Sequence, residues 1–162
     1  MTLIRRAAPA DAAALAGLRY EFRAALGQPA EPREPFLARC REWMVQRLTD
    51  GRGWRCWLAQ DGAGGLVGTA WLQLIEKLPN PVAEPEIHGY VTSLYVQPDR
   101  RGAGLGSALL AAALHECEVL RVDTVILWPT PKSRPLYQRH GFVAGDDLLE
   151  WRLASPRPPE LV

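Results

Sequence analysis

The sequence predicts an α/β protein with a mixed, mostly antiparallel sheet of about seven strands flanked by about four helices. Runs rich in β-branched and aromatic residues alternate with segments whose apolar residues recur at helical spacing. The sequence DGAGG (61–65) joins two strand-like runs and is typical of a hairpin between antiparallel strands. One helical segment, 107–120, lies between two further strand-like runs, which indicates a parallel, right-handed crossover.

The first fifty residues predict one strand and two helices. Residues 2–7 (TLIRRA) are the expected first strand. A helix then opens at Pro9, with its apolar residues spaced along one face, and Gly27 is its expected end. Three prolines indicate a loop over 28–35, and a second amphipathic helix is expected over 35–49.

The middle of the chain predicts three strands. Two of them, 54–60 and 65–75, flank the hairpin turn. The stretch 76–86 is rich in proline and acidic residues, so we expect an exposed connection there. Residues 87–96 alternate and carry aromatic and β-branched side chains, which predicts the third strand.

The remaining sequence predicts alternating helices and strands in one domain. The expected elements are a helix over 107–120, a strand over 122–128, a short helix over 133–140, and two short strands over 142–144 and 148–153. A single domain over residues 1–154 accounts for all of them. The proline-rich tail 155–162 is expected to be disordered.

Composition excludes several classes of protein. The 19 Lys and Arg against 18 Asp and Glu give a net charge of +1, whereas nucleic-acid and membrane-surface binders carry a marked basic excess. The cysteines Cys40, Cys56 and Cys117 are odd in number and show neither a metal-ligand pattern nor a disulfide framework. The charged, proline-containing N-terminus is unlike a signal peptide, so we expect a cytoplasmic protein that binds neither nucleic acid nor membrane, and no metal.

The turn VQPDRRGAGLGS (96–107) predicts an anion site. The leading N–H groups of a helix lack internal partners and sit at the positive end of the helix dipole. Glycines allow a ligand to approach those groups closely, and two arginines add charge beside them. A P-loop is a poor match because no lysine follows the last glycine, and a Rossmann turn is a poor match because Ser107 stands where its third glycine would be.

Two segments of the chain resemble the GNAT superfamily of N-acetyltransferases. The acyl-CoA-binding pattern of that family, Gln/Arg-x-x-Gly-x-Gly/Ala, is met by Arg101, Gly104 and Gly106. A second family segment, with Leu-Tyr followed by Gly-Phe, is similar to RPLYQRHGF (134–142). The predicted order of elements fits the family over nearly the whole chain, which implies a GNAT-like sheet whose two central parallel strands splay apart.

The resemblance implies that acetyl-CoA is the co-substrate and assigns its contacts. Backbone amides of the turn would hold the pyrophosphate, and the preceding strand would pair with the pantetheine arm. The residues at these positions are Arg101, Gly102, Ala103, Gly104, Leu105, Gly106 and Ser107 for the pyrophosphate, and Leu94, Tyr95 and Val96 for the arm.

The resemblance also implies catalytic roles in the attack of an amine on a thioester. Tyr137 matches the family tyrosine that acts as general acid toward the leaving thiolate. An alkyl ammonium has a pKa of about 10.4, so the free amine needs a base or a water relay. Tyr90 stands where several members carry a glutamate, which leaves Glu86 or His88, on the same strand face, as candidate bases or as solvated edge residues.

The acceptor is expected to be a primary amine of a small molecule or a peptide. Trp43 and Trp151 are candidates for lining its pocket. Because the glutamate is missing, a non-catalytic acyl-CoA-binding module is the alternative to an enzyme. Near-neutral charge argues against acetylation of an aminoacyl-tRNA. Many members of the family are homodimers, so a homodimer is among the expected assemblies.

Overall fold

The sheet of the computed structural model, which describes residues 1–27, 29–51 and 53–151, has five strands in the order β1-β2-β3-β4-β5. The strands are β1 (Leu3–Arg6), β2 (Trp54–Gln60), β3 (Leu66–Glu76), β4 (Ile87–Val96) and β5 (Thr124–Ile126). Strands β1 to β4 pair antiparallel, and β4 pairs with β5 in parallel. The mixed, mostly antiparallel sheet and its parallel crossover are therefore confirmed.

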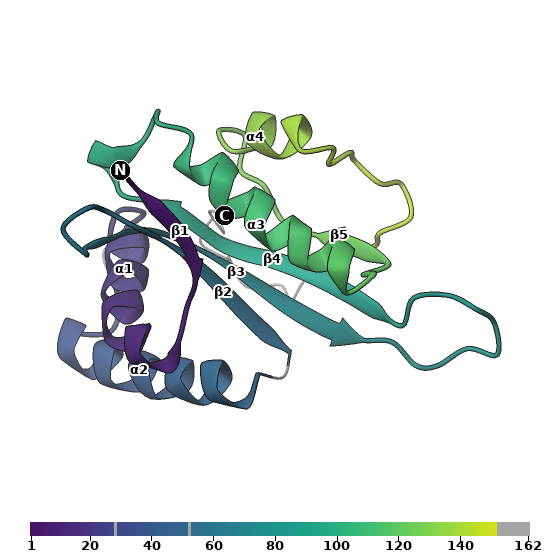
Figure 1. Ribbon diagram of the computed structural model, residues 1–162, viewed down its shortest axis with the longest axis horizontal. Helices are drawn as coiled ribbons and strands as arrows, with labels where there is room; N and C mark the ends of the chain where they lie inside the picture. The colour runs from purple at the N-terminus through teal and green to yellow at the C-terminus, as the bar shows by residue number, and fades with distance from the viewer. Residues whose placement is uncertain (28, 52, 152–162) are drawn as a thin grey trace.

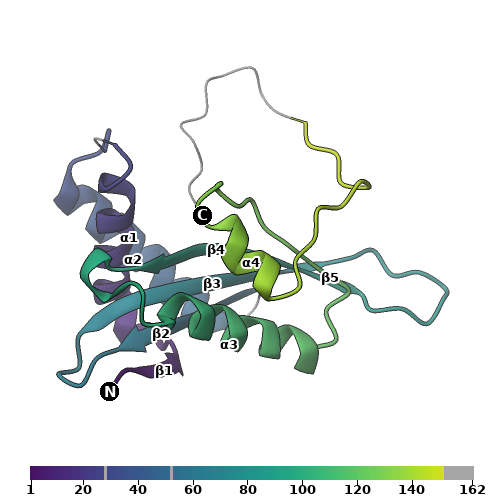
Figure 2. The same ribbon diagram turned by 90° about the horizontal axis from the view of Figure 1, so that it is seen from above.

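Helices cover both faces of the sheet (Figures 1 and 2). The four α-helices are α1 (Ala12–Ala24), α2 (Arg33–Asp50), α3 (Leu105–Val119) and α4 (Arg134–Arg139), and two 3₁₀ turns are η1 (Pro9–Asp11) and η2 (Pro98–Arg100). Helices α1 and α2 lie on one face, and α3 and α4 lie on the other (Figure 1). The β3–β4 connection extends beyond the sheet in both views, as expected of an exposed segment.

Each face of the sheet has its own apolar core. On the α1–α2 face, Leu15 and Met44 pack with Cys56 and Trp71 of the sheet. On the other face, the core includes buried residues of α3, Tyr137 of α4 and inward residues of β2, β3 and β4. Full burial of a leucine-sized side chain contributes about 1.5–3 kcal/mol, so these two cores hold the helices in place against the sheet.

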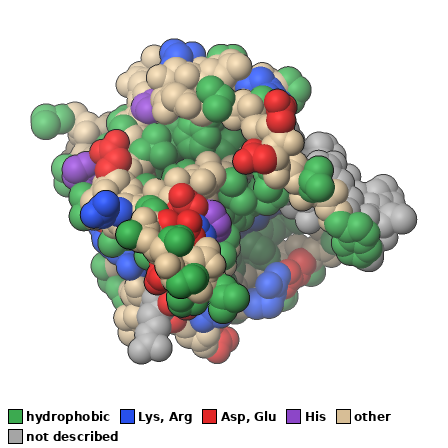
Figure 3. All heavy atoms as spheres, turned by 90° about the vertical axis from the view of Figure 1, so that its right-hand side faces the viewer, with side chains coloured by type: hydrophobic (Ala, Val, Ile, Leu, Met, Phe, Trp, Pro, Cys, Tyr) green, Lys and Arg blue, Asp and Glu red, His purple; other side chains and the backbone are tan. Residues whose placement is uncertain are grey.

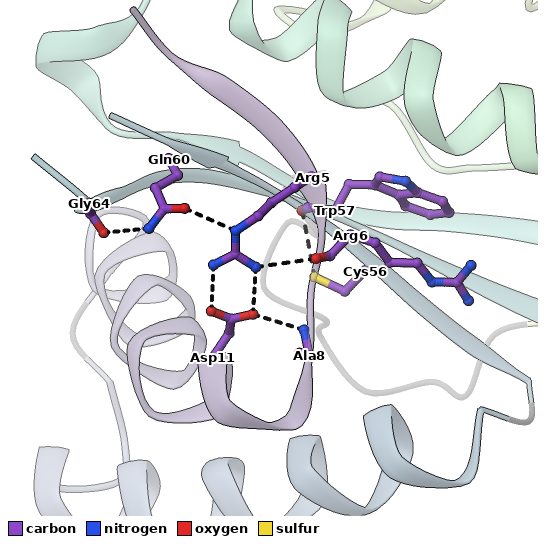
Figure 4. A network of polar contacts seen from close by, with 8 residues as sticks. All are labelled: Arg5, Arg6, Ala8, Asp11, Cys56, Trp57, Gln60 and Gly64. Carbon is purple, nitrogen blue, oxygen red and sulfur yellow. Dashed lines mark hydrogen bonds and ion pairs between the residues drawn. The ribbon is translucent and has the colours of Figure 1, made fainter. Parts of the chain in front are cut away.

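A polar network ties the first strand to the start of α1 (Figure 4). Arg5 donates two hydrogen bonds to the carboxylate of Asp11, at 2.9 and 2.8 Å, and a third to Gln60 at 2.9 Å. Asp11 also accepts the Ala8 N–H at 2.8 Å. The guanidinium holds the pKa of Asp11 below its usual value, chiefly through these hydrogen bonds. This network fixes the point at which the chain leaves the sheet and enters the helix.

One detail of the N-terminal prediction differs from the structure. Helix α2 begins at Arg33, inside the segment expected to be a loop, because Pro32 occupies the position before the first helical residue and accepts the Phe36 N–H at 3.2 Å. A proline before the first turn loses no helical hydrogen bond, so it starts the helix rather than delaying it.

The prediction of about seven strands is wrong for the described residues, which contain five. Residues 142–144 and 148–151 form no strand, and residues 152–153 of the last predicted strand lie outside the described residues. Leu149 and Trp151 are 92% and 85% exposed, so their apolar alternation does not reflect a buried sheet face. The tail 155–162 also lies outside the described residues.

Strand β5 is shorter than the predicted 122–128. The Val122 N–H donates to the Cys117 carbonyl of α3 at 2.9 Å, so this residue still belongs to the end of the helix, and the first bond to β4 is from the Asp123 N–H to the Ile87 carbonyl at 2.8 Å. After Ile126, Pro129 and Pro131 lack the N–H groups that a longer ladder would need.

Candidate functional site

The glycine-rich turn between β4 and α3 presents a row of backbone N–H groups. Gly102 and Gly104 have φ of 83° and 77°, in the left-handed region where a Cβ is strained. The N–H groups of 102–107 make no backbone hydrogen bond with any described residue, and the first helical bond is from Ala108 to the Gly104 carbonyl at 3.0 Å. These free donors converge at the N-terminus of the fifteen-residue helix α3, which is suited to an anion.

The two arginines of this turn have protein partners. Arg101 donates from Nε to the Val96 carbonyl at 2.9 Å and lies over the Tyr95 ring, with Cζ 5.9 Å from the ring centroid. Arg100 lies 3.4 Å from carboxylate oxygens of Asp61 and Asp99. Arg101 therefore ties the turn to the end of β4, and the anion site depends mainly on backbone donors.

Strands β4 and β5 part beside this turn. They pair only from His88 with Thr124 to Tyr90 with Ile126. Strand β4 continues to Val96, and no described strand pairs with residues 91–96 on the β5 side. An extended ligand could therefore pair with this edge as an added strand would. Leu94, Tyr95 and Val96 all lie on it.

A β-bulge lies in the same stretch of β4. Thr69 pairs with Tyr95 and Trp71 with Thr92, so two residues of β4 stand against one of β3. One of the two is Ser93, which has φ of 53°. A non-glycine residue in this region is strained by about 1–3 kcal/mol, a feature that clusters at functional sites.

The bulge changes which side chains face each layer of helices. Val91 packs in the α3-side core before the bulge, whereas Leu94 and Val96 pack there after it. Tyr95 instead stacks on Phe22 of α1, with ring centroids 5.0 Å apart. The bulge thus places the backbone of Ser93 at the end of a cavity on the α1–α2 face.

This cavity, which we call the aromatic cavity, has a volume of about 370 Å³. Its wall combines a tryptophan cluster with arginines and the hydroxyl groups of β4. The lining residues are Arg19, Phe36, Arg39, Cys40, Trp43, Met44, Trp54, Trp71, Tyr90, Thr92 and Ser93. The size falls in the lower part of the ~300–1,000 Å³ range of small-molecule sites.

Tyr137 is buried on the other face of the sheet, 1% exposed, and its hydroxyl has no hydrogen-bond partner among the described residues. Its ring packs edge-on against Phe142, with centroids 5.7 Å apart. Burial raises the pKa of this phenol well above its usual value, and the nearby Tyr90 acts in the same direction. Tyr137 therefore stays protonated and can donate a hydrogen bond to a ligand.

Short contacts hold α4 beside the glycine-rich turn. Ser107 Oγ, in the first turn of α3, lies 2.6 Å from Nε2 of His140 at the end of α4. At the start of α4, Thr130 and Ser133 exchange hydrogen bonds, with each backbone N–H donating to the other side-chain oxygen at 2.9–3.0 Å. These contacts fix the helix that carries Tyr137.

A larger cavity of about 800 Å³ lies between β5, α3, α4 and the segment 141–148, and Tyr137 lines it. Figure 3 shows hydrophobic side chains gathered in a hollow on the side of the molecule from which the β3–β4 connection extends. His88 also lines this larger cavity, and its Nδ1 lies 3.7 Å from Asp123. Glu86 is exposed and lines neither cavity.

The structure therefore brings together most of the predicted site. The glycine-rich turn, the unpaired edge of β4 and α4 lie next to one another, whereas neither candidate base lines the aromatic cavity. Trp43 lines that cavity as expected, and Trp151 lines neither one. Within the described residues, no group of three His, Cys, Asp or Glu could hold a metal ion. No helix there is long and apolar enough to span a bilayer.

The residues Arg19 and Ser93 were not predicted from the sequence. Both depend on the packing of α1 against β4, where Arg19 Nη1 donates to Ser93 Oγ at 2.9 Å across 74 positions of sequence. In the run YVTSLYV the adjacent polar residues Thr92 and Ser93 interrupt the alternation, which was an indication of the bulge that the prediction of a regular strand did not use. The alternation of aromatic residues and arginines in the two N-terminal helices was the available indication of a ligand surface.

Comparison with known proteins identifies the family of the chain. The model of the acetyltransferase (GNAT) family matches residues 17–142. An aminoglycoside N(6′)-acetyltransferase type 1 of Stenotrophomonas maltophilia is 38% identical over 109 residues. That alignment covers 67% of this chain and 63% of the relative, so the chain spans less than two thirds of that protein's length.

Solved structures match the fold over nearly the whole chain. A GCN5-related N-acetyltransferase from Ralstonia eutropha superposes with a TM-score of 0.76 and 26% identity, covering 96% of this chain and all of that one. A structure described as a predicted acetyltransferase with acetyl-CoA, from Clostridium acetobutylicum, has a TM-score of 0.77 and 23% identity, with 94% and 96% of the chains covered.

Proposed function

The chain belongs to the GNAT family of acetyltransferases, and we propose that it transfers an acetyl group from acetyl-CoA to a primary amine of a small molecule. One observation carries the proposal: the free N–H groups of 102–107 lie at the end of an unpaired strand edge, so a diphosphate and an extended arm can be held together. The buried Tyr137 hydroxyl, which has no hydrogen-bond partner among the described residues, supports acetyl-CoA as the ligand because a ligand would supply that partner.

The backbone of the turn would hold the diphosphate of acetyl-CoA. The donors from Gly102 to Ser107 are fixed by two left-handed glycines and need no rearrangement to meet an anion. The pantetheine arm would then run along Val96, Tyr95 and Leu94, which brings its thioester to the bulge at Ser93. A backbone N–H near Leu94–Val96 would donate to the carbonyl oxygen as negative charge develops on it.

The amine would approach from the aromatic cavity, on the opposite side of β4 from Tyr137. Its nitrogen lone pair attacks the thioester carbon, a C–N bond forms, and the C–S bond breaks. The nitrogen loses a proton, and the sulfur gains one. The products are an acetamide and the free thiol, so atoms and charges balance without any other reactant.

Tyr137 would donate a hydrogen bond to the departing sulfur. Burial raises the pKa of the phenol. A thiolate in the same buried environment also has a raised pKa, because the low dielectric disfavours its charge. The pKa difference that opposes proton transfer is therefore smaller than the difference between an exposed thiol and a buried phenol. Glu86 and His88 are the candidate bases and would act through a water relay. Tyr90 and Thr92 line the aromatic cavity and carry hydroxyls that could take part in such a relay.

Thiol release from acetyl-CoA tests the proposal. The assay uses a panel of primary amines that includes aminoglycosides, because the curated relative carries that name, together with diamines, amino acids and peptide N-termini. We expect amine-dependent release for at least one class. Calorimetry separates the outcomes: acetyl-CoA binding without release for any amine would favour the non-catalytic acyl-CoA-binding module. Absence of binding would contradict both.

A further inference from the structure

The hydroxyl of Ser107 joins the glycine-rich turn to the end of α4. Its Oγ lies 2.6 Å from Nε2 of His140, which is its one hydrogen-bond partner among the described residues. Ser107 also carries one of the backbone N–H groups of the turn that bond to no described carbonyl. Because the Cα–Cβ bonds of a helix tilt toward its N-terminus, this hydroxyl lies at the same end of α3 as those donors.

A second contact places the same side of α4 against the turn. A Cβ at Gly106 would lie 3.6 Å from Cδ2 of Leu136. Leu136 and His140 are four residues apart, so they lie one above the other along α4. Tyr137 stands between them in the sequence, and it lines the larger cavity together with His140. The contacts of Leu136 and His140 with the turn therefore set the position of the Tyr137 side chain.

Helix α4 depends on such contacts, because it has only six residues. A helix of that length is not stable by itself in water. At its C-terminal end, the N–H groups of His140 and Phe142 donate to the Tyr137 carbonyl at 2.9 and 3.1 Å. The residue that contacts Ser107 is thus bonded through its own backbone to Tyr137. A change at the Ser107 hydroxyl can reach Tyr137 through one side chain and one backbone hydrogen bond.

The direction of the Ser107–His140 hydrogen bond depends on what occupies the turn. A serine hydroxyl has one proton to donate, and histidine Nε2 donates or accepts according to which ring nitrogen carries the proton. His88 and His115 each lie 3.7 Å from a carboxylate, whereas His140 has no such neighbour among the described residues. An anion in the turn needs donors. It therefore favours the arrangement in which Nε2–H donates to Ser107 and the Ser107 O–H donates to the anion.

From these contacts we infer that Ser107 and His140 couple the binding of a diphosphate to the placement of Tyr137. The Ser107 hydroxyl binds the diphosphate, and His140 is a positioning residue that holds both this hydroxyl and the end of α4. The inference rests on the proposed binding of acetyl-CoA and adds two side chains to that site. The phenol of Tyr137 is then held most firmly when a diphosphate occupies the turn.

Matched acyl donors test the role of Ser107. Acetyl-CoA and acetyl-pantetheine carry the same thioester, but only acetyl-CoA has a diphosphate. In Ser107→Ala, the Kd for acetyl-CoA measured by calorimetry should rise about 10- to 100-fold, the range of a hydrogen bond to a charged group, and the Kd for acetyl-pantetheine should change less than about twofold. Ser107→Thr, which keeps the hydroxyl, should restore most of the affinity. An unchanged Kd for acetyl-CoA, or equal changes for both donors, would overturn the inference.

A split between binding and turnover tests the role of His140. In His140→Leu the Ser107 hydroxyl can still donate to the diphosphate, so the Kd for acetyl-CoA should rise less than about fivefold. The kcat with acetyl-CoA should fall about 10-fold, because Tyr137 is no longer held in place. With acetyl-pantetheine, kcat should be nearly equal in the wild type and the variant. His140→Gln, whose side-chain amide can donate to Ser107, should restore most of the lost kcat.

His115→Leu is the matched control for His140→Leu. His115 is also on or beside a helix of this face, its side chain is 76% exposed, and it lines neither cavity. This control should leave Kd and kcat unchanged with both donors, and thermal unfolding without ligand checks that each variant keeps the fold. If His140→Leu lowers kcat by the same factor with both donors, His140 only supports the fold and the inference is wrong.

Nitrogen NMR of the histidine side chains tests the pair without turnover. The chain has three histidines, and the signals that disappear in His140→Gln are those of His140. With saturating acetyl-CoA, Nε2 of His140 should carry a proton, and the change in its signal should be absent with acetyl-pantetheine and in Ser107→Ala. An unprotonated Nε2 in the acetyl-CoA complex would overturn the inference and leave acetyl-CoA binding standing. If acetyl-CoA does not bind the wild type, the proposed function fails as well.

Discussion

Substitution of Tyr137 by phenylalanine should change stability and activity in opposite directions. The hydroxyl is buried and has no partner among the described residues. A buried polar group without a hydrogen bond costs about 1–3 kcal/mol, and the phenylalanine keeps the ring contact with Phe142 at 5.7 Å. Without ligand, Tyr137→Phe should therefore be about 1 kcal/mol more stable, which raises Tm by roughly 2–4 °C.

The same variant should lose catalysis. Removal of a general acid typically lowers kcat by about 10²- to 10⁴-fold. Acetyl-CoA should stabilise the wild type more than the variant, because the hydroxyl gains its partner only in the complex. Thermal unfolding with and without acetyl-CoA, together with steady-state thiol release, measures all three effects.

A second tyrosine serves as the control for the Tyr137→Phe variant. Tyr20→Phe, on α1 beside Phe36 and outside the proposed site, should leave both Tm and kcat nearly unchanged. A lower Tm for Tyr137→Phe would mean that the hydroxyl already has a partner in the free protein. Unchanged kcat would show that the leaving sulfur needs no donor from Tyr137.

Three further predictions concern the turn, the N-terminal network and the sheet. Gly104→Ala places a Cβ at φ of 77° and should raise the KM for acetyl-CoA several-fold, whereas Gly51→Ala, which places a Cβ at φ of 60° at the end of α2, should not. Asp11→Asn should lower the free energy of unfolding near neutral pH. The pKa of Asp11 is lowered in the folded state, so its contribution to stability is complete above the unfolded pKa of about 3.9 and is lost as pH falls below it. The free energies of unfolding of the wild type and the variant, measured with denaturant, should therefore converge in acid. Gly68→Ala would bring a Cβ to 3.0 Å from the Tyr95 carbonyl and should destabilise by about 1–3 kcal/mol in urea, whereas Gly17→Ala, with no atom within 4 Å in the middle of α1, should stabilise by up to about 1 kcal/mol. Equal effects within either glycine pair, or a pH-independent difference for Asp11, would contradict these arguments.

The sequence predicts most of the helices and strands because their periods are local. Four of the seven expected strands, and all four helices, are found within a few residues of their predicted bounds, and a fifth strand is found in shortened form. The glycine-rich turn before α3 was also predictable, since glycine spacing and a following helix are local features. Its left-handed glycines and free N–H groups are those that such a turn requires.

Features that depend on tertiary packing could not be predicted in this way. The bulge at Ser93 depends on how β4 meets both β3 and α1, and the sequence indicates it only by the adjacent polar residues Thr92 and Ser93. The last predicted strands fail for a related reason: alternation over 148–151 resembles an edge strand, but Leu149 and Trp151 are exposed and find no described neighbouring strand.

Amide hydrogen exchange across residues 102–107, with and without saturating acetyl-CoA, tests the central assignment most directly. These N–H groups have no backbone acceptor among the described residues, so their exchange should be fast without ligand and should slow markedly in the complex. Acetyl-pantetheine, which has the thioester arm but no diphosphate, should not slow it. If saturating acetyl-CoA leaves the exchange of this turn unchanged, the diphosphate is held elsewhere and the account is wrong.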